Sequence, residues 1–273
     1  MAKSEKLKKE VKTVSQLKEM THVLEETAAR DISLMRERII EGRPYFQEAW
    51  KIYRIMQQLT PPAPDVLNKH LVVAVTLEWG MTGSLLTHVL DKTEELYKRY
   101  EADILLTGNM GRDRFADRDE RTVHFFNVPR KSTYEDIAEL NKVVAKYMHI
   151  HFVYPRFESL SKQVVTVSSV STVHDNDPKE TTIDAKRFTV EPDINSIVNY
   201  MNEVVIGLTV YSYFSEALLA YSAAQMVAMR AASDNAKDEL RRLNIKYNKA
   251  RREQIDAKLR ELYESRPSKK GAL

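Results

Sequence analysis

The chain contains no cysteine among its 273 residues, so disulfides, thiolate metal sites and cysteine nucleophiles are excluded. Glycine is scarce as well, with only seven residues. Neither a complete Gly-x-Gly-x-x-Gly fingerprint nor a Gly-Lys-Ser/Thr phosphate loop occurs. The glycine pairs Gly80/Gly83 and Gly108/Gly111 are therefore more simply explained as turns than as nucleotide sites.

Long apolar runs are also missing. No window holds the eighteen or so uninterrupted apolar residues of a membrane span. The segment closest to one, Val204–Met229, is interrupted by polar side chains at Ser212, Ser215, Glu216, Ser222 and Gln225. The first nine residues have no apolar core, so we expect no secretory signal. We therefore expect no direct membrane insertion.

The chain has no large excess of either basic or acidic residues: 42 basic residues against 39 acidic ones give a net charge of +3. The sequence therefore does not predict nucleic-acid binding. His149 and His151 alternate on one face of a predicted strand and could share a metal ion, but no third ligand stands at a fixed spacing. No Gly-x-Ser-x-Gly nucleophile elbow occurs. We expect no catalytic residue, metal or cofactor in this chain.

Both ends of the chain predict long helices. Residues 1–59 carry a narrow apolar stripe, typical of a helix that packs against one other helix, although Pro44 leaves open a kink or a second helix. Residues 193–265 contain no proline within the predicted helix, which would span roughly 105 Å. Asp193 is its expected N-cap. Residues 266–273 form a polar tail.

The apolar stripe of the last helix narrows from Leu240 to Leu262. Its members recur at a mean step of roughly 3.67 residues, which predicts a nearly straight helix pair rather than a tightly wound left-handed coil. They are Leu240, Leu243, Tyr247, Ala250, Ile255, Leu259 and Leu262.

The middle of the chain, residues 65–190, alternates strand and helix signals and predicts a small α/β domain. His70–Leu77 and Ala102–Thr107 are apolar on both faces, as in buried parallel strands. A helix is expected between them, over Ser84–Tyr100. The last two predicted strands, 149–154 and 163–173, are expected to pair antiparallel.

Two segments of the last helix carry a family likeness. Gln225-Met-Val-Ala-Met-Arg-Ala-Ala-Ser-Asp-Asn-Ala236 and Leu243-Asn-Ile-Lys-Tyr-Asn-Lys-Ala-Arg-Arg252 resemble the C-terminal signature of the gamma subunit of F-type ATP synthases. Further matches follow in the family's order, at residues 12–15, 21–29, 42–45, 108–113, 152–157 and 164–167. The resemblance covers nearly the whole chain.

This resemblance implies an α/β fold: an antiparallel coiled coil of long N- and C-terminal helices with an inserted Rossmann-like α/β domain. It implies a central rotor shaft that couples transmembrane proton or sodium flow to ATP synthesis or hydrolysis in a ring of alpha and beta subunits. The inserted domain would contact the epsilon subunit and the membrane ring of c subunits. The chain would lie on the cytoplasmic side of a bacterial-type cell membrane, as a peripheral protein.

Polar residues within the two matching segments are the candidates for contact with the ring, because a polar cluster on an otherwise apolar helix must face something. Met226 is more simply a packing residue, but it lies in the same signature. The candidate set is Gln225, Met226, Arg230, Asp234, Asn235, Arg251 and Arg252.

Two departures from the family pattern motivate an alternative. The turn Leu77–Ser84 differs from the family's glycine-rich turn, and the tail from Ser265 is charged where the family's is small and apolar. The alternative is the shaft of a repurposed rotary-type ATPase that does not make ATP. A third hypothesis, weaker than both, is a stand-alone nucleotide-binding enzyme that uses Gly80 and Gly83.

Overall fold

The computed structural model describes residues 2–57, 67–117, 123–128, 134–171 and 194–264. These residues belong to two compact units. Met1–Thr27 with Met226–Leu273 form one, called here the coiled-coil unit, and Ala28–Gln225 form the other, called the α/β unit. The two longest helices, α1 (Ala2–Gln57) and α4 (Ile194–Glu264), each contribute to both units.

The α/β unit is built on a five-stranded sheet in the order β3-β2-β1-β4-β5. The strands are β1 (Leu67–Ala74), β2 (Asp103–Leu106), β3 (Val123–Phe125), β4 (Tyr147–Ser159) and β5 (Lys162–Ser171). The first four strands are parallel, and β5 pairs antiparallel with β4. The antiparallel pair predicted at the end of the domain is therefore confirmed.

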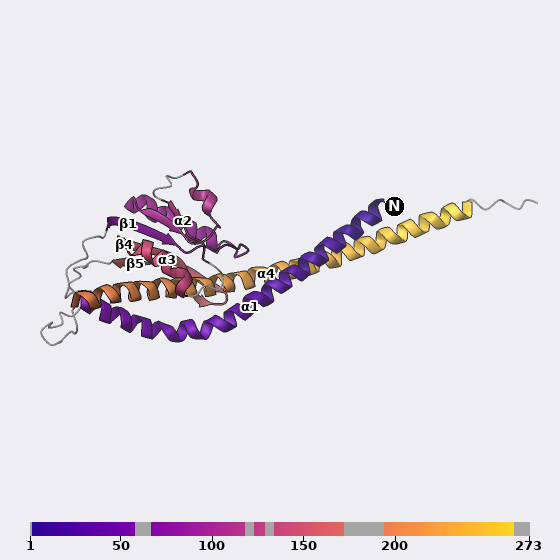
Figure 1. Cartoon of the computed structure of the whole chain (residues 1–273). Helices are drawn as coiled ribbons and strands as arrows, with labels where there is room; N and C mark the ends of the chain where they lie inside the picture. The colour runs from indigo at the N-terminus through magenta and orange to yellow at the C-terminus, as the bar shows by residue number, and fades with distance from the viewer. Residues whose placement is uncertain (1, 58–66, 118–122, 129–133, 172–193, 265–273) are drawn as a thin grey trace, which may run out of the picture. The chain divides into compact units, whose positions relative to one another are not determined.

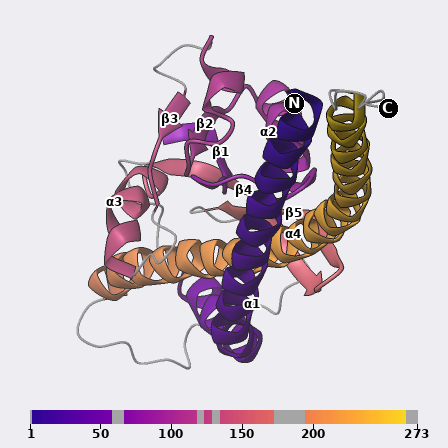
Figure 2. The same ribbon diagram turned by 90° about the vertical axis from the view of Figure 1, so that its right-hand side faces the viewer.

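Two helices and a short 3-10 helix connect these strands: α2 (Leu85–Tyr100), η1 (Arg112–Phe115) and α3 (Tyr134–Val144). The helix α2 follows β1, and α3 precedes β4, so the parallel strands are joined by helical crossovers. Figures 1 and 2 show α2 on one face of the sheet and α3 on the other. Glu101 ends α2 in a left-handed conformation, with φ of 47°.

The core of the α/β unit lies on both faces of the sheet. The aliphatic run at the end of β1 is fully buried, as its apolar character on both faces predicts. Residues 205–225 of α4 pack against the sheet on the face opposite α2. Tyr213 stacks on Tyr154 at 4.6 Å between ring centroids, and the Tyr221 hydroxyl donates a 2.9 Å hydrogen bond to the Val75 carbonyl.

The apolar composition of α4 follows from this packing. Among the described residues, Val204–Glu264 contains an 18-residue window apolar enough to cross a membrane, and 61% of that window is buried inside the protein. The sequence contains polar interruptions there, and the structure shows that three of them, Glu216, Ser222 and Gln225, are buried. Burial of this kind is what a core helix shows, so the window is explained without a bilayer.

The helix predictions hold at the level of the backbone. α1 is a single helix through Pro44, which resolves the alternative of a second helix in favour of continuation. α4 begins and ends within one residue of the predicted limits. The expected N-cap Asp193 and the polar tail 266–273 lie outside the described residues.

Candidate functional site: the coiled-coil unit

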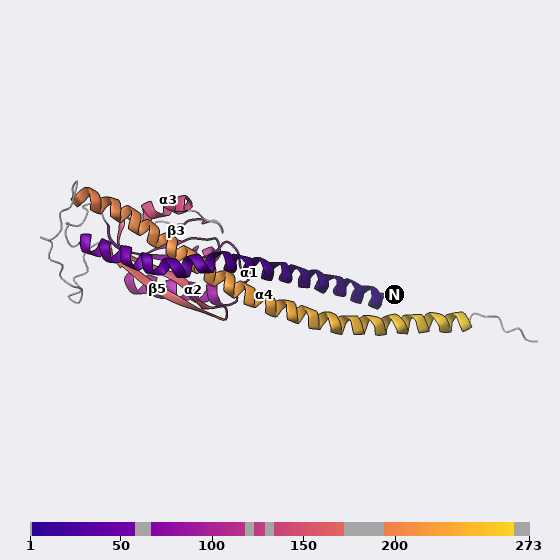
Figure 3. The same ribbon diagram turned by 90° about the horizontal axis from the view of Figure 1, so that it is seen from below.

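The coiled-coil unit pairs residues 2–27 of α1 with the part of α4 that begins at Met226. The two helices run in opposite directions, as the views in Figures 1 and 3 agree. The buried residues of α4 in this unit recur every seven positions, at Met229, Ala236, Leu243 and Ala250. Seven-residue spacing is that of a left-handed coiled coil.

This spacing corrects the expected step of roughly 3.67 residues. That step counted Ile255, Leu259 and Leu262 as members of the seam, but these side chains are 47%, 47% and 64% exposed. Figures 1 and 3 show α4 running past the N-terminal end of α1, so the last turns of α4 extend beyond its helix partner. With those three residues removed, the stripe keeps the seven-residue repeat.

The seven predicted contact residues all lie on α4, but the structure separates them by exposure. Arg230, Asp234, Asn235, Arg251 and Arg252 are exposed, and Met226 is half-buried. Gln225 is only 3% exposed, so its side chain is buried in the chain itself. The argument that a polar residue on this helix must face outward therefore fails for Gln225, whereas the contact role of the other six stays a prediction.

The exposed surface of this part of α4 is basic. Residues 230–252 contain eight Lys or Arg residues against three Asp or Glu residues. The positions 230, 237, 244 and 251 stand seven apart and hold Arg230, Lys237, Asn244 and Arg251, all exposed. Seven residues make close to two helical turns, so these side chains follow one line along the helix. Such a line favours an acidic partner surface.

In the α/β unit, the two predicted glycine turns pack against each other and serve the fold. A Cβ on Gly108 would lie 2.4 Å from the Leu77 carbonyl carbon, so only glycine fits there. The Met110 amide donates a 2.9 Å hydrogen bond to the Leu77 carbonyl. Gly83 and Gly111 adopt positive φ angles of 62° and 92°. Close backbone approach and turn geometry explain these glycines.

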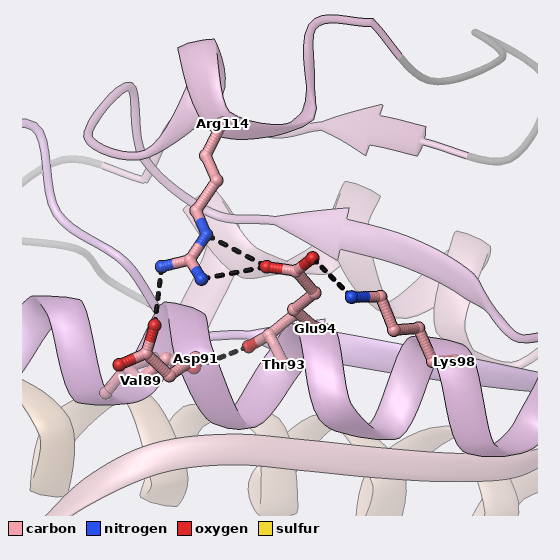
Figure 4. Close-up of polar contacts among 6 residues, drawn as sticks. All are labelled: Val89, Asp91, Thr93, Glu94, Lys98 and Arg114. Carbon is pink, nitrogen blue, oxygen red and sulfur yellow. Dashed lines mark hydrogen bonds and ion pairs between the residues drawn. The ribbon is translucent and has the colours of Figure 1, made fainter.

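The second glycine turn is followed by Arg114, which joins η1 to α2 (Figure 4). Its guanidinium contacts the Asp91 carboxylate at 2.7 Å and the Glu94 carboxylate at 2.8 Å. Lys98 lies 2.8 Å from the other oxygen of Glu94. Hydrogen bonds from Lys98, the larger contribution, and from Arg114 lower the pKa of Glu94 to about 2. The network fixes the turn on its helix, which is a structural task.

The histidines considered for a metal site gain a neighbour that the sequence did not reveal. His70 of β1 pairs in register with His149 of β4, next to His151. Within the described parts of the chain, no group of three or more His, Cys, Asp or Glu side chains is arranged to hold a metal ion. Sequence reasoning missed His70 because it lies 79 positions before His149 and is joined to it only through strand register.

Comparison with known proteins tests the family likeness. The family model described as "ATP synthase" matches residues 3–265. The ATP synthase gamma chain of Laribacter hongkongensis is 24% identical, and that of Burkholderia pseudomallei is 26% identical. Each alignment covers 96% of this chain and 98% of the relative.

Solved structures agree in fold. The rotor of the Euglena gracilis mitochondrial ATP synthase matches with a TM-score of 0.68 at 14% identity, covering 93% of this chain and 99% of that one. A chain of the Tetrahymena thermophila central stalk and c-ring matches with a TM-score of 0.60 at 19% identity, covering 78% and 99%. Because the family model matches residues 3–265, almost the whole of this chain, the chain belongs to the ATP synthase family, as a relative of the gamma chains.

Proposed function

We propose that this chain is the central rotor shaft of an F-type ATP synthase, which couples transmembrane ion flow to ATP synthesis or hydrolysis. The observation that carries the proposal is the match to gamma chains over 96% of the chain, together with a helix pair whose outer faces are exposed. The full-length relatives are synthase subunits, which favours this function over a repurposed rotary-type ATPase.

The shaft acts by contacting different states of its partners unequally. In the coiled-coil unit, α4 presents a basic face to solvent and buries another face against α1. The surface of the helix pair is therefore asymmetric about its long axis. Such a shaft, when turned, favours one conformation of each ring subunit over the others, because a partner shifts a conformational equilibrium only through differential contact. In this proposal the ATP chemistry takes place in the ring of alpha and beta subunits, and this chain supplies stiffness and surface.

The exposed basic line on α4 is the proposed contact with that ring. Arg251 and Arg252 lie at its far end, where acidic loops of the beta subunits would meet them. Arg230, Asp234 and Asn235 lie on the same helix, near the start of the coiled-coil unit at Met226. Met226, half-buried at the start of the coiled-coil unit, and Gln225, already buried within the chain, are the weaker members of the set.

The remaining partners follow from membership of the complex. The structural relatives come from synthase assemblies that include F1 and the c-ring, so this chain is assigned to a membrane-associated complex as a peripheral subunit. Within it, we place the α/β unit against the epsilon subunit and the ring of c subunits. The cytoplasmic side of the membrane is the proposed location.

The direct test is isolation of the chain, with an affinity tag, from membranes of its native source. The proposal predicts that alpha, beta and c subunits co-purify with it and that the complex pumps ions when supplied with ATP. A chain that is recovered without an alpha–beta ring would overturn the proposal.

The ring contact has its own test in the double charge reversal Arg251→Glu/Arg252→Glu. Both side chains are exposed, so the reversal leaves folding intact while it turns an attractive contact into a repulsive one. We expect the ratio of ion pumping to ATP hydrolysis to fall severalfold, whereas the matched Arg251→Lys/Arg252→Lys variant keeps the charges and stays close to wild type. An unchanged ratio in the reversed variant contradicts the assignment of these two residues.

A further inference from the structure

Three histidines gather on one face of the sheet in the α/β unit. In the strand register His70 of β1 lies opposite His149 of β4, and Val72 lies opposite His151. Because alternate residues share a face of a strand, His70, His149 and His151 project from the same side. The His70 ring stacks on that of His149 at 4.6 Å and on that of His151 at 5.3 Å between centroids.

Tyr100, the last residue of α2, covers the rings of His70 and His151. Its ring stacks on those of His70 and His151 at 4.8 and 4.6 Å between centroids. The cluster therefore joins four elements, namely β1, β4, α2 and, through Ser169, β5. It lies on the face opposite the one where Tyr213 of α4 packs on Phe152.

A chain of hydrogen bonds runs through the cluster. His70 Nδ1 lies 3.0 Å from His151 Nε2, and His151 Nδ1 lies 2.8 Å from the Ser169 hydroxyl. A hydrogen bond between two ring nitrogens needs one nitrogen with a proton and one without. The bond therefore survives only while at least one of these two imidazoles is neutral, whichever tautomer is adopted.

The surroundings hold the imidazoles in the neutral form. Burial lowers the pKa of His70, and the neighbouring His149 lowers it further by a smaller amount. Burial, then His70 and His149, lowers the pKa of His151 to about 4. His151 is 8% exposed. Burial and close approach therefore disfavour the charged forms of His70 and His151.

Of the charged groups named on the neighbouring elements, one is a cation and the other is already engaged by Tyr147 and Lys69. On α2, the Arg99 guanidinium lies 5.4 Å from the centre of the Tyr100 ring and is itself a cation. On β2, the Asp103 carboxylate accepts a 2.9 Å hydrogen bond from the Tyr147 hydroxyl and lies 3.8 Å from Lys69. Neither group is among the causes of the lowered histidine pKa values. Protons taken up by the cluster would therefore repel one another.

We propose that the cluster of His70, His149 and His151 is an acid-sensitive lock on the α/β unit. While its imidazoles are neutral, it holds β1, β4, β5 and the end of α2 together. When they take up protons, the bond between His70 and His151 breaks, the stacked rings repel, and this corner of the unit loosens. No metal enters the proposal, since the described residues provide no three-ligand group.

The direction of the pH effect follows from the pKa of His151. Above pH 6.5, the ordinary value for histidine, the side chain is neutral in the folded and unfolded states alike. Below that pH the unfolded chain takes up the proton and the folded chain does not, so stability falls until the pH nears 4. Between pH 7.5 and 5.5, one such histidine raises the opening equilibrium constant about tenfold.

Hydrogen–deuterium exchange of the full-length protein at pH 7.5 and pH 5.5, corrected for the intrinsic exchange rate, tests the lock. We expect protection of the β1 and β4 amides to fall by about tenfold or more at the lower pH. The coiled-coil segment 236–250 of the same molecule serves as the internal reference and should keep its protection. Strand protection that does not respond to pH would overturn the proposal.

Two variants locate the effect. His151→Gln keeps an amide able to bond to Ser169 and His70 but binds no proton, so the acid response should shrink by about tenfold. His88→Gln, at an exposed position on α2, is the matched control and should keep the full response. A full response in His151→Gln would contradict the role of the cluster.

A measurement on the unmodified protein keeps the test independent of how the variants fold. NMR titration of the imidazole protons should show His70 and His151 titrating below the ordinary histidine pKa of about 6.5. Titration of His151 at that ordinary value would overturn the proposal.

Discussion

The two parts of α4 have opposite relations to solvent, although one unbroken helix forms both. Between residues 205 and 225 nearly every side chain is buried or half-buried, and the longest run of fully buried residues is 219–225. Between residues 229 and 250 the fully buried positions recur only once in seven. The first part belongs to the core of the α/β unit, whereas the second keeps most of its circumference available for other molecules. One helix therefore both packs in the core of the α/β unit and presents a largely exposed surface.

Two tyrosines on α4 give the largest expected difference between these parts. Tyr221 is fully buried and its hydroxyl bonds to Val75, whereas Tyr263 is 72% exposed. We expect Tyr221→Ala to lower the free energy of unfolding by about 3–5 kcal/mol, through lost packing and the cavity left behind. Tyr263→Ala should change it by less than about 0.5 kcal/mol. Chemical denaturation followed by tryptophan fluorescence measures both, and equal effects would break the contrast.

A smaller difference is expected inside the coiled-coil unit, between two neighbouring aliphatic residues. Leu243 is buried in the seam, whereas Ile245, two positions away, is 70% exposed. Leu243→Ala should destabilise the helix pair by about 2 kcal/mol, at the low end for a core leucine because the seam is narrow. Ile245→Ala should cost little, which thermal melting followed by circular dichroism would show. If Ile245→Ala lowered the melting temperature more than Leu243→Ala, the face of α4 assigned to the seam would be wrong.

The smallest difference concerns ion pairs. Arg114 contacts two carboxylates of α2, whereas Arg241 on the coiled-coil unit contacts only Asp238 among the ion pairs described for it, at 3.5 Å. Arg114→Gln should raise the pKa of Glu94 from about 2 toward its ordinary value, though not fully, because Lys98 remains. Carbon NMR of the carboxyl group measures this shift.

The accompanying stability effect has a defined pH window. Because the pKa of Glu94 is lowered in the folded state, its contribution is present above the ordinary value of about 4.3 and is lost as the pH falls toward 2. The Arg114→Gln variant should therefore differ from wild type at pH 7 and converge with it in acid. Arg241→Gln should match wild type at both pH values, since single exposed pairs contribute little.

Local sequence patterns predict the helices and strands well, but they predict poorly which residues of different elements come into contact. Runs such as Leu71–Val75 show both-face apolar character that only a buried strand satisfies, and the helix limits follow from proline and from periodicity. Contacts set by register are different. His70 reaches His151 through the pairing of β1 with β4, which includes an irregularity between Leu67 and His70. A sequence read strand by strand does not contain that information.

The end of the coiled-coil seam shows the same limit. Ile255 and Leu259 follow Ala250 in the predicted apolar stripe, yet both are 47% exposed. The C-terminal end of α4 runs past the N-terminal end of α1 (Figures 1 and 3), so its last turns have no helix partner there. Burial at these positions depends on where a different helix begins, far away in the sequence. Gln225 shows the opposite case, since a polar side chain predicted to face outward is only 3% exposed.

In the proposed function, the C-terminal part of α4 transmits force between ion flow and ATP chemistry. The most direct measurement compares ATP-driven ion pumping with ATP hydrolysis in complexes whose chain ends at Glu239, against complexes with the full chain. The account predicts that the shortened chain, which lacks Leu243, Ala250 and the basic pair Arg251 and Arg252, loses pumping relative to hydrolysis. A shortened complex that pumps as many ions per ATP as the intact one would contradict it.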